Sequence, residues 1–468
     1  MIAFLGALPV LSTIIALALG ASSLRAALLG VGAAALTILA AFPIPMDSMA
    51  PTALLWSPIL VEVLLIVGGG LLLSEVLRQA GGQAALANWI RARSGPGVGS
   101  ILLVVHGVTP FAESLTGFGV GIAIGIPLLA HFGLPARKVA VIGLLGLCAV
   151  PWGSMGPGTL IAATMSDLPF PDLGVTSAVV SLIPFVVTGV VAAWLASPPA
   201  RRPVAVLQGA LSGVMLTVFI TMTNAAFGTP PAGALGALTM IALHLLMGLR
   251  RKEAVRLESV GRRALASYAV LLGGVLAAGW IIRVGGLPES WRYVASPAPW
   301  LFIAVIWFAR GWPERELSRR TWESWLRVAP VTGLFIVLGI LMAMSGMAAF
   351  LARTLAETGS AYLLAAPFVG AAGGFVTGSN SGANAMFATT QAEIARSLGV
   401  DVLWFMAVHN VAASFLLMAS PGKIEMAIQL SPADADEHRR WIQTTIFGVA
   451  LSVVATLAMV NVLVPRLF

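Results

Sequence analysis

The chain of 468 residues is 58% hydrophobic and only 10% charged, with a formal net charge of +8 at pH 7. Soluble domains carry about 25% charged residues, so this composition excludes an ordinary soluble enzyme and indicates a polytopic membrane protein. The basic balance does not indicate nucleic acid as a partner, because most Arg and Lys residues lie in short segments between apolar runs, as in the cytoplasmic loops of membrane proteins.

Apolar runs of membrane-spanning length follow one another from the start of the chain. A span needs roughly 20 apolar residues. The runs predict twelve spans, at residues 3–19, 24–42, 57–80, 138–153, 174–198, 204–226, 232–249, 264–282, 296–309, 328–350, 402–419 and 442–464. Residues 1–20 lack a basic start and a small-residue cleavage site, so we interpret them as part of the first span and not as a signal peptide.

Two further apolar segments, 99–131 and 361–397, are interrupted near their middle by glycine and polar residues. Broken helices are tolerated in a membrane only where protein or a water-filled cavity satisfies their backbone. We therefore interpret both segments as re-entrant hairpins, which enter and leave the membrane on the same side.

The distribution of basic residues agrees with this layout. With the N-terminus outside, the cytoplasmic segments contain all of the 27 Lys and Arg residues except Arg283, Arg292, Arg353, Arg396 and Arg466. A true span at either hairpin would move every later loop to the other side and remove this bias. The layout predicts an integral protein of the plasma (inner) membrane with both termini on the extracytoplasmic side.

The predicted spans and hairpins also repeat. A shift of about 262 residues places the first five spans on the last five and the first hairpin on the second, the arrangement of an inverted-topology repeat. The predicted organisation is a first repeat at 1–200, linking spans with a basic loop at 201–263, and a second repeat at 264–468. The two hairpin tips would then meet near the middle of the membrane.

Both tips are small and polar. They read ESLTGFGVG at 113–121 and TGSNSGANAMF at 377–387, and each is followed by an apolar run and a Pro-Gly break, at 156–158 and 420–422. Hydroxyls, amides and N–H groups at a helix N-terminus suit a small carboxylate, because the helix dipole favours negative charge there. A packing surface of small residues is the alternative for the glycines. The predicted substrate-binding residues are Ser114, Thr116, Gly117, Phe118, Gly119, Ser154, Thr377, Gly378, Ser379, Asn380, Ser381, Asn384, Asn410 and Ser420.

Proton coupling needs titratable groups inside the membrane, and the sequence offers few. An ionised carboxylate in hydrocarbon costs roughly 2.5–3.5 kcal/mol, so such a group is neutral, paired or functional. Glu113 in the first tip, Glu62 in the third span and His409 in the eleventh are the predicted proton-coupling residues. The alternatives are a structural acid that bonds the hairpin backbone for Glu113, snorkelling or an interhelical hydrogen bond for Glu62, and a packing role for His409 and for His106.

The motifs resemble the lactate permease family. The resemblance rests on PFAESLTGFGVGIAIG, GLLGLCAVPWGSMGPGT, TGSNSGANAMF and NVAASFLLMASPGKI, which cover most of the chain in order. It implies inward transport of L-lactate, D-lactate or glycolate with protons, and it implies a site lined by Glu113, Gly117, Phe118, Gly119, Thr377, Ser379 and Asn384. The chain departs from the family's pattern at Asn380, where an acid is usual, and at 416–420, where a lysine-containing stretch is usual. These departures leave the exact substrate open.

The sequence thus predicts an all-α, elevator-like secondary transporter with about twelve spans, two re-entrant hairpins and two inverted repeats. Its function would be the import of a small 2-hydroxymonocarboxylate by proton symport; the alternative is a sodium- or proton-coupled carrier of another small organic anion. The expected partners are the anion, protons and membrane lipid, with a homodimer by analogy to elevator-type carriers. A single cysteine, Cys148, and five histidines without HExxH or CxxCH spacing predict neither a metal nor another cofactor. Without clustered acids or a Ser/His/acid set, we do not expect an enzyme.

Overall fold

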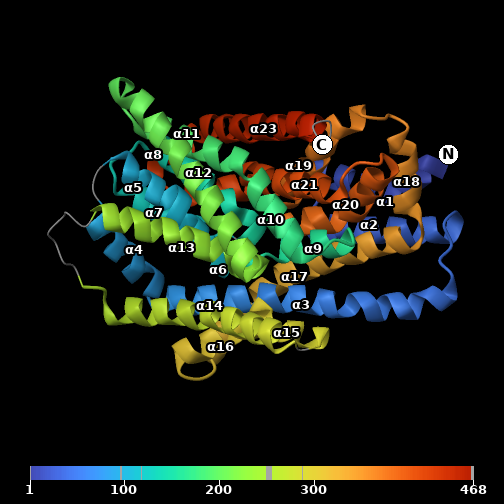
Figure 1. Cartoon of the computed structure of the whole chain (residues 1–468), viewed down its shortest axis with the longest axis horizontal. Helices are drawn as coiled ribbons and strands as arrows, with labels where there is room; N and C mark the ends of the chain where they lie inside the picture. The colour runs from blue at the N-terminus through green and yellow to red at the C-terminus, as the bar shows by residue number, and fades with distance from the viewer. Residues whose placement is uncertain (1, 95–96, 118, 249–255, 287, 465–468) are drawn as a thin grey trace.

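A computed structural model shows the chain as a bundle of helices, most of which run along the long axis of the molecule (Figure 1). The structure describes residues 2–94, 97–117, 119–248, 256–286 and 288–464, and within these ranges it contains helices and no strand. Phe118, Arg466 and the first part of the basic loop at 250–255 lie outside the described residues.

Eleven helical segments within these ranges are long and apolar enough to cross a membrane. They are Ser23–Ala40, Trp56–Gln79, Val98–Thr116, Ala136–Met155, Phe170–Ala196, Pro199–Phe227, Thr229–Leu246, Ser259–Gly285, Arg315–Met344, Val402–Ala419 and Ala433–Leu463. The prediction of an all-helical, polytopic membrane protein is therefore confirmed. All predicted spans except the first and the ninth coincide with one of these segments; those two correspond to the shorter apolar helices Phe4–Leu17 and Pro297–Ala309.

The segment Val98–Thr116 differs from the prediction, because by length and composition it qualifies as a span although it lies in the first predicted hairpin. Its surroundings distinguish it from a lipid-facing helix. It is 83% buried inside the protein, whereas the segment Pro199–Phe227 is 39% buried. A broken helix needs such an enclosed position, and the re-entrant course of this segment stays a prediction.

Both predicted hairpins consist of two helices joined by a glycine break. In the first, α5 (Val98–Leu103), the π-helical turn η1 (Val104–Val108) and α6 (Thr109–Thr116) precede the break, and α7 (Val120–Ala130) follows it. In the second, α19 (Ala361–Thr377) is followed by α20 (Asn380–Ser397). Gly117, Gly119 and Gly378 have φ of 69°, 88° and 62° at the breaks, a conformation that glycine adopts without the Cβ penalty.

The helix after each hairpin is broken as well. α8 (Ala136–Leu145) continues through the 3₁₀ segment η2 (Gly146–Met155) to α9 (Pro157–Met165), and α21 (Val402–Leu416) continues through η5 (Leu417–Ala419) to α22 (Pro421–Leu430). Pro157 and Pro421 begin the second helix in each case, where a missing N–H does no harm. The predicted Pro-Gly breaks are thus real interruptions of the helices.

The remaining helices surround these four broken segments. Two N-terminal helices, α1 (Ile2–Ala18) and α2 (Ser23–Ala40), pack on α17 (Arg315–Met344) and α18 (Met347–Ala356). Five other helices pack against the hairpins and the broken helices: α10 (Phe170–Val180), α11 (Leu182–Ala196), α12 (Arg202–Phe227), α13 (Thr229–Gly248) and α23 (Arg439–Leu463). Gly189 and Gly209 bring α11 and α12 into backbone contact, since a Cβ on either would overlap the other's carbonyl oxygen.

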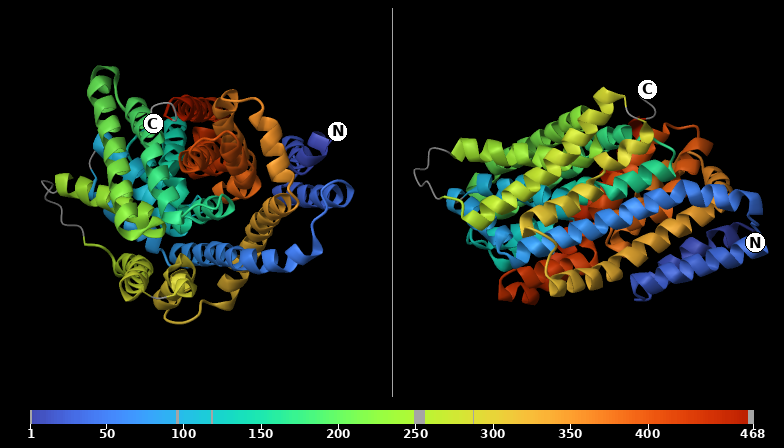
Figure 2. Two further views of the ribbon diagram at one scale, coloured as in Figure 1. Left: turned by 45° about the vertical axis from the view of Figure 1, so that its right-hand side comes forward. Right: turned by 90° about the horizontal axis from the view of Figure 1, so that it is seen from below.

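A second group of helices forms its own apolar cluster. α3 (Met46–Gln79), α14 (Ser259–Gly285) and α16 (Pro297–Ala309) bury residues such as Leu73, Leu271 and Leu301 against one another. The remaining elements are short: the helices α4 (Gly82–Arg93) and α15 (Arg292–Ala295), and the 3₁₀ segments η3 (Pro199–Arg201), η4 (Glu289–Trp291) and η6 (Ala433–His438). Figure 2 shows α14 and α16, in yellow, at one edge of the molecule, beyond α3 and away from the helices of the hairpins.

The crossing of α12 can be tested by cysteine labelling. The helix has 26 residues and is about 39 Å long, so its two ends should reach opposite faces of the bilayer. With the buried Cys148 replaced by alanine, we expect Arg201→Cys to react with an impermeant maleimide only from the cytoplasmic side and Ala225→Cys only from outside. Labelling of both cysteines from the same side would refute the predicted topology.

Candidate binding site

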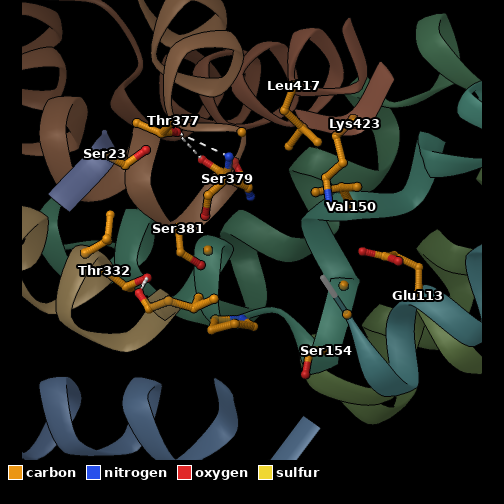
Figure 3. A pocket seen from close by; sticks show the side chains of 18 of the residues that line it. Ser23, Glu113, Val150, Ser154, Thr332, Thr377, Ser379, Ser381, Leu417 and Lys423 are labelled. Carbon is orange, nitrogen blue, oxygen red and sulfur yellow. Dashed lines mark hydrogen bonds between the residues drawn. The ribbon is translucent and has the colours of Figure 1, made fainter. Parts of the chain in front are cut away.

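The two tips, the first Pro-Gly break and residues on either side of the second break line one cavity of about 320 Å³ (Figure 3). Among the predicted site residues, those that line it are Glu113, Gly117, Ser154, Thr377, Gly378, Ser379, Asn380 and Ser381. The remaining wall comes from Ser23, Val150, Gly153, Pro157, Gly158, Arg327, Val328, Val331, Thr332, Leu417 and Lys423. Segments that are far apart in the sequence therefore converge on one polar cavity.

Glu113 is buried, with 5% of its surface exposed, and its carboxylate bonds to the backbone of its own tip. The N–H of Gly119 donates to Oε1 and Oε2 at 3.0 and 3.1 Å, and the N–H of Gly121 donates to Oε2 at 3.1 Å. The carboxylate thus occupies the N-terminus of α7, where orphan N–H groups and the helix dipole both favour a negative charge. The structural alternative for Glu113 matches this geometry, and the same side chain also faces the cavity.

The backbone opposite Glu113 is unusual. Ser154, Met155 and Gly156 have φ of 45°, 66° and 81°, and two of these three are not glycine. Such conformations are costly for residues with a Cβ and persist where the surrounding structure enforces them. Ser154 lines the cavity, and its hydroxyl is buried without a hydrogen-bond partner among the described residues.

The second tip forms the N-terminus of α20. The Ser379 hydroxyl caps this helix by accepting a hydrogen bond from the N–H of Gly382 at 3.2 Å. The Thr377 hydroxyl donates to the carbonyl of Gly373 at 2.7 Å and accepts from the N–H of Ser379 at 3.2 Å. These bonds fix the tip so that the first turn of α20, with Asn380 and Ser381, faces the cavity.

Behind the second tip, three buried asparagines form a network that reaches the other half of the chain. Asn384 donates through Nδ2 to Oδ1 of Asn380 at 3.0 Å, to Oδ1 of Asn410 at 2.9 Å and to the carbonyl of Gly158 at 3.1 Å. Asn410 in turn donates to the hydroxyls of Thr159 and Ser177, each at 3.1 Å. Asn384 and Asn410 do not line the cavity, so their position is that of a support which holds α20 against the break before α9.

Lys423 and Arg327 line the cavity, although the sequence pattern does not predict this. By pattern both are cytoplasmic basic residues, since Lys423 follows the second Pro-Gly break and Arg327 precedes a predicted span. Because α22 begins at Pro421 and α17 begins at Arg315, both side chains instead lie within helices and line the cavity. A basic residue directly after a break that is already assigned to the site was the signal that could have identified Lys423.

Several predicted site residues lie beside the cavity and do not line it. The Thr116 hydroxyl donates to the carbonyl of Ala112 at 2.6 Å, and the Ser114 hydroxyl packs near Gly233 of α13. Gly119 supplies an N–H to Glu113, and Ser420 lies next to Gly378. Phe118 lies outside the described residues.

The other two predicted proton-coupling residues are not brought together with Glu113. Glu62 lines a separate cavity of about 520 Å³ between α3 and α16, with Tyr293 and Ser296. His409 is buried on α21 against Gly370 of α19, and neither ring nitrogen has a partner among the described residues. By contrast, His106 is within hydrogen-bond distance of the hydroxyls of Ser212 and Thr188, at 2.8 and 3.1 Å, which agrees with a packing role.

Comparison with known proteins agrees with the family that the motifs resemble. Residues 318–463 match the model of the L-lactate permease family, a region that includes the second tip, Arg327 and Lys423. The L-lactate permease of Salmonella typhimurium (strain LT2) is 27% identical over 253 residues, and that of Escherichia coli K12 is 27% identical over 252 residues; each alignment covers 51% of this chain and 43% of the relative. The L-lactate permease of Streptococcus iniae is 22% identical over 347 residues, or 66% of this chain and 73% of the relative.

The chain thus spans less than half the length of the Salmonella and Escherichia relatives that it matches. The resemblance to the lactate permease family is confirmed, and the modest identities are those of a divergent relative.

The asparagine network can be tested through stability. Asn384→Asp keeps the shape of the side chain but removes the amide donor that serves three oxygens. A buried polar group left without its partner costs about 1–3 kcal/mol, so we expect a clear fall in the thermal denaturation midpoint of the protein in detergent. The matched control Asn88→Asp changes an exposed asparagine and should leave the midpoint unchanged; equal midpoints for both variants would contradict the network's role.

The first tip can be tested in the same way. Gly117 has φ +69°, and a Cβ there would lie 2.6 Å from the Cβ of Ser154, whereas Gly133 has φ +71° and nothing within 4 Å. Gly117→Ala should therefore destabilise the protein more than Gly133→Ala, because only the first variant adds a clash to the backbone strain. We expect the lower thermal midpoint for Gly117→Ala; a midpoint equal to that of Gly133→Ala would show that the tip and the break do not pack as described.

Proposed function

We propose that the protein is a secondary transporter that imports a small 2-hydroxymonocarboxylate, of the lactate or glycolate type, by proton symport. The observation that carries this proposal is the convergence of both glycine-broken tips on one polar cavity that contains a buried carboxylate and two cations. Polar breaks in two halves of a chain mark the binding sites of many secondary transporters. The relatives named L-lactate permeases support the substrate class.

The size and chemistry of the cavity support a small anion. About 320 Å³ lies at the lower end of the roughly 300–1,000 Å³ range of small-molecule sites. Lys423 and the N-terminus of α20 are suited to a carboxylate, and the hydroxyl of Ser381 is suited to a hydroxyl group on the neighbouring carbon. A substrate with one carboxylate and one hydroxyl can bind to these groups, whereas a dicarboxylate would bring a second negative charge without a partner.

The order of the helices supports the proposed repeats. The first half of the chain contains the series α3, α4, the α5–α6 segment, α7, α8 and α9, and the second half contains the corresponding series α17, α18, α19, α20, α21 and α22. Both series have a glycine break, at Gly117 and Gly378, and a helix that begins at a proline, Pro157 and Pro421. We propose two inverted repeats, at 1–200 and 264–468, joined by the linking spans in 201–263. The enclosed position of Val98–Thr116, at 83% buried like the broken segments Ala136–Met155 and Val402–Ala419, supports a broken helix there.

The two apolar clusters suggest which parts move. α14 and α16 bury residues in one cluster together with much of α3, whereas most of the hairpins, the broken helices and their neighbours belong to the other. α3 contributes to both clusters, and Leu115, Met155 and Ala234 join α6, η2 and α13 to the first. We propose that the first group is the scaffold and that the second carries the substrate past it in an elevator-like motion. A homodimer through the scaffold is part of this proposal by analogy only.

Glu113 is the proposed proton carrier because its protonation would change the tip. As a carboxylate it accepts hydrogen bonds from two backbone N–H groups at the N-terminus of α7, and one of these groups is shared by both of its oxygens. Protonation removes the negative charge that strengthens these bonds, which are about twice as strong for an ionised acceptor. Binding of a proton would therefore loosen the first tip at the position where the substrate lies, and this links the proton to the movement of the tips.

The experiment is uptake of labelled L-lactate into proteoliposomes under an inward proton gradient without sodium. We expect accumulation that a protonophore abolishes. Glu113→Gln should lose this gradient-driven accumulation and keep counterflow exchange, because the amide cannot carry the proton but still fills the tip. The control Glu357→Gln changes an exposed glutamate and should accumulate L-lactate like the wild type.

Gradient-driven accumulation by Glu113→Gln at the wild-type level would remove Glu113 from the coupling role. Uptake that requires sodium, or uptake only of a different organic anion, would favour the alternative carrier over the proposed one.

A further inference from the structure

Lys423 occupies a position that a structural lysine does not favour. It lies in the first turn of α22, where the helix dipole is positive and disfavours a cation. Its ammonium is also close to the tip before α7, because a Cβ on Gly119 would lie 2.9 Å from the Lys423 Nζ. Within the described part of the chain, the ammonium has no hydrogen-bond partner and is attracted by the charge of Glu113.

The Glu113 carboxylate does not need Lys423 for its own stability. Its two oxygens already accept bonds from Gly119 and Gly121. Figure 3 shows Lys423 and Glu113 on one side of the cavity and Ser379 and Ser381 on the other. The ammonium therefore faces the space between the tips and can bind a second carboxylate there.

We propose that Lys423 binds the carboxylate of the substrate. Lys423 and Glu113 together then keep the cavity electrically neutral, both when it is empty and when it contains the substrate. Transport is therefore electroneutral, with one proton per monocarboxylate. This inference rests on the proposed function. It identifies Lys423 as the cation that binds the substrate and gives the ratio of protons to substrate.

The stoichiometry follows from the charges. In the empty cavity, the Glu113 carboxylate and the Lys423 ammonium sum to zero. A bound monocarboxylate adds one negative charge, and a carboxylate oxygen of Glu113 then binds one proton from the bulk solution on the same side of the membrane to form an O–H group. The loaded cavity is neutral again, which avoids moving a net charge through a low-dielectric region. Release of the anion and the proton on the other side returns the empty, neutral site.

The other charged or titratable groups do not alter this balance. Arg327 lines the cavity, but its side chain is exposed and donates to the Ser324 hydroxyl at 2.9 Å, so water screens its charge. The other charged or titratable groups on α22 and on the elements that pack against α6 and α22 do not line the cavity; they include Glu62, Glu75, Arg78, His106, Arg137, Lys138, His244, Glu425, Asp434, Asp436, Glu437, His438, Arg439 and Arg440. Of these, Glu425 pairs with Arg439 at 2.6 Å.

The balance predicts a specific change in Glu113→Gln. The empty site of this variant carries +1 and the loaded site is neutral, so each turnover that takes up L-lactate moves one net charge when the empty site returns. One charge moving through 100 mV changes the equilibrium accumulation ratio about 50-fold. Net uptake by Glu113→Gln should therefore respond to a valinomycin-imposed potassium potential, with faster uptake when the inside is positive, and should lose its dependence on the pH gradient.

The experiment compares purified wild type and variants in proteoliposomes, with labelled L-lactate and a trapped pH-sensitive dye. In the wild type we expect one proton per L-lactate and an initial rate that changes less than twofold between −100 and +100 mV at fixed pH. Lys423→Met should raise the KM for L-lactate in counterflow at least tenfold, whereas Lys423→Arg, which keeps the charge, should retain most of the affinity. Lys138→Met, on α8 and outside the cavity, is the matched control and should behave like the wild type.

The outcomes separate the two proposals. A wild type that transports L-lactate with a potential-dependent rate, or a Lys423→Met variant with unchanged KM, would overturn the charge assignment and leave the proposed function intact. Absence of both uptake and counterflow of L-lactate and glycolate by a monodisperse wild type would overturn the proposed function and the assignment with it. Size-exclusion profiles and thermal midpoints show whether each variant is folded. If Lys423→Met does not fold, the second neutral variant Lys423→Gln provides the charge test.

Discussion

The constraint on which the structure depends is that the backbone of a broken helix must find hydrogen-bond partners inside a bilayer, where water does not supply them. At the first tip the Glu113 carboxylate meets this requirement by accepting from the N–H groups of Gly119 and Gly121. At the second tip the neutral hydroxyls of Ser379 and Thr377 do so. The groups that make the tips stable are thus the same polar groups that line the cavity, and stability and binding cannot be assigned to separate residues.

The tips alone would not define a cavity, because each must also be held against the opposite break. Asn384 provides this link by bonding to the carbonyl of Gly158, and Asn410 extends it to Thr159 and Ser177. A buried polar network of this kind stabilises the structure only when its donors and acceptors are hydrogen-bonded. Because the network joins α20 and α21 to α9 and α10, a rearrangement of one tip has a direct mechanical route to the other half of the chain.

Much of this arrangement was predictable, and the exceptions have physical reasons. Hydropathy identified most spans, and glycine among hydroxyls and amides identified both tips, because a membrane tolerates such breaks only at enclosed sites. Hydropathy could not distinguish the enclosed Val98–Thr116 from a lipid-facing helix, since both are apolar. Composition also assigned Lys423 to a loop, because basic residues between spans usually lie there. Only the fold shows that α22 begins at Pro421 and directs Lys423 into the cavity, and that Asn384 and Asn410 support the wall behind it.

The difference between the two tips explains why an anion would complete the site. The N-terminus of α7 holds a carboxylate that belongs to the protein, whereas the N-terminus of α20 has a neutral serine cap and faces the cavity. In the proposed repeat these two helices are counterparts, so a substrate carboxylate at α20 would occupy the place that Glu113 occupies at α7. Lys423 lies where it can attract Glu113 and face the opposite tip, and its charge can compensate either carboxylate but not both. With the exposed Arg327 screened by water, two carboxylates and the Lys423 ammonium require one proton for neutrality. This is the physical reason to expect that the site binds an acid and a proton together.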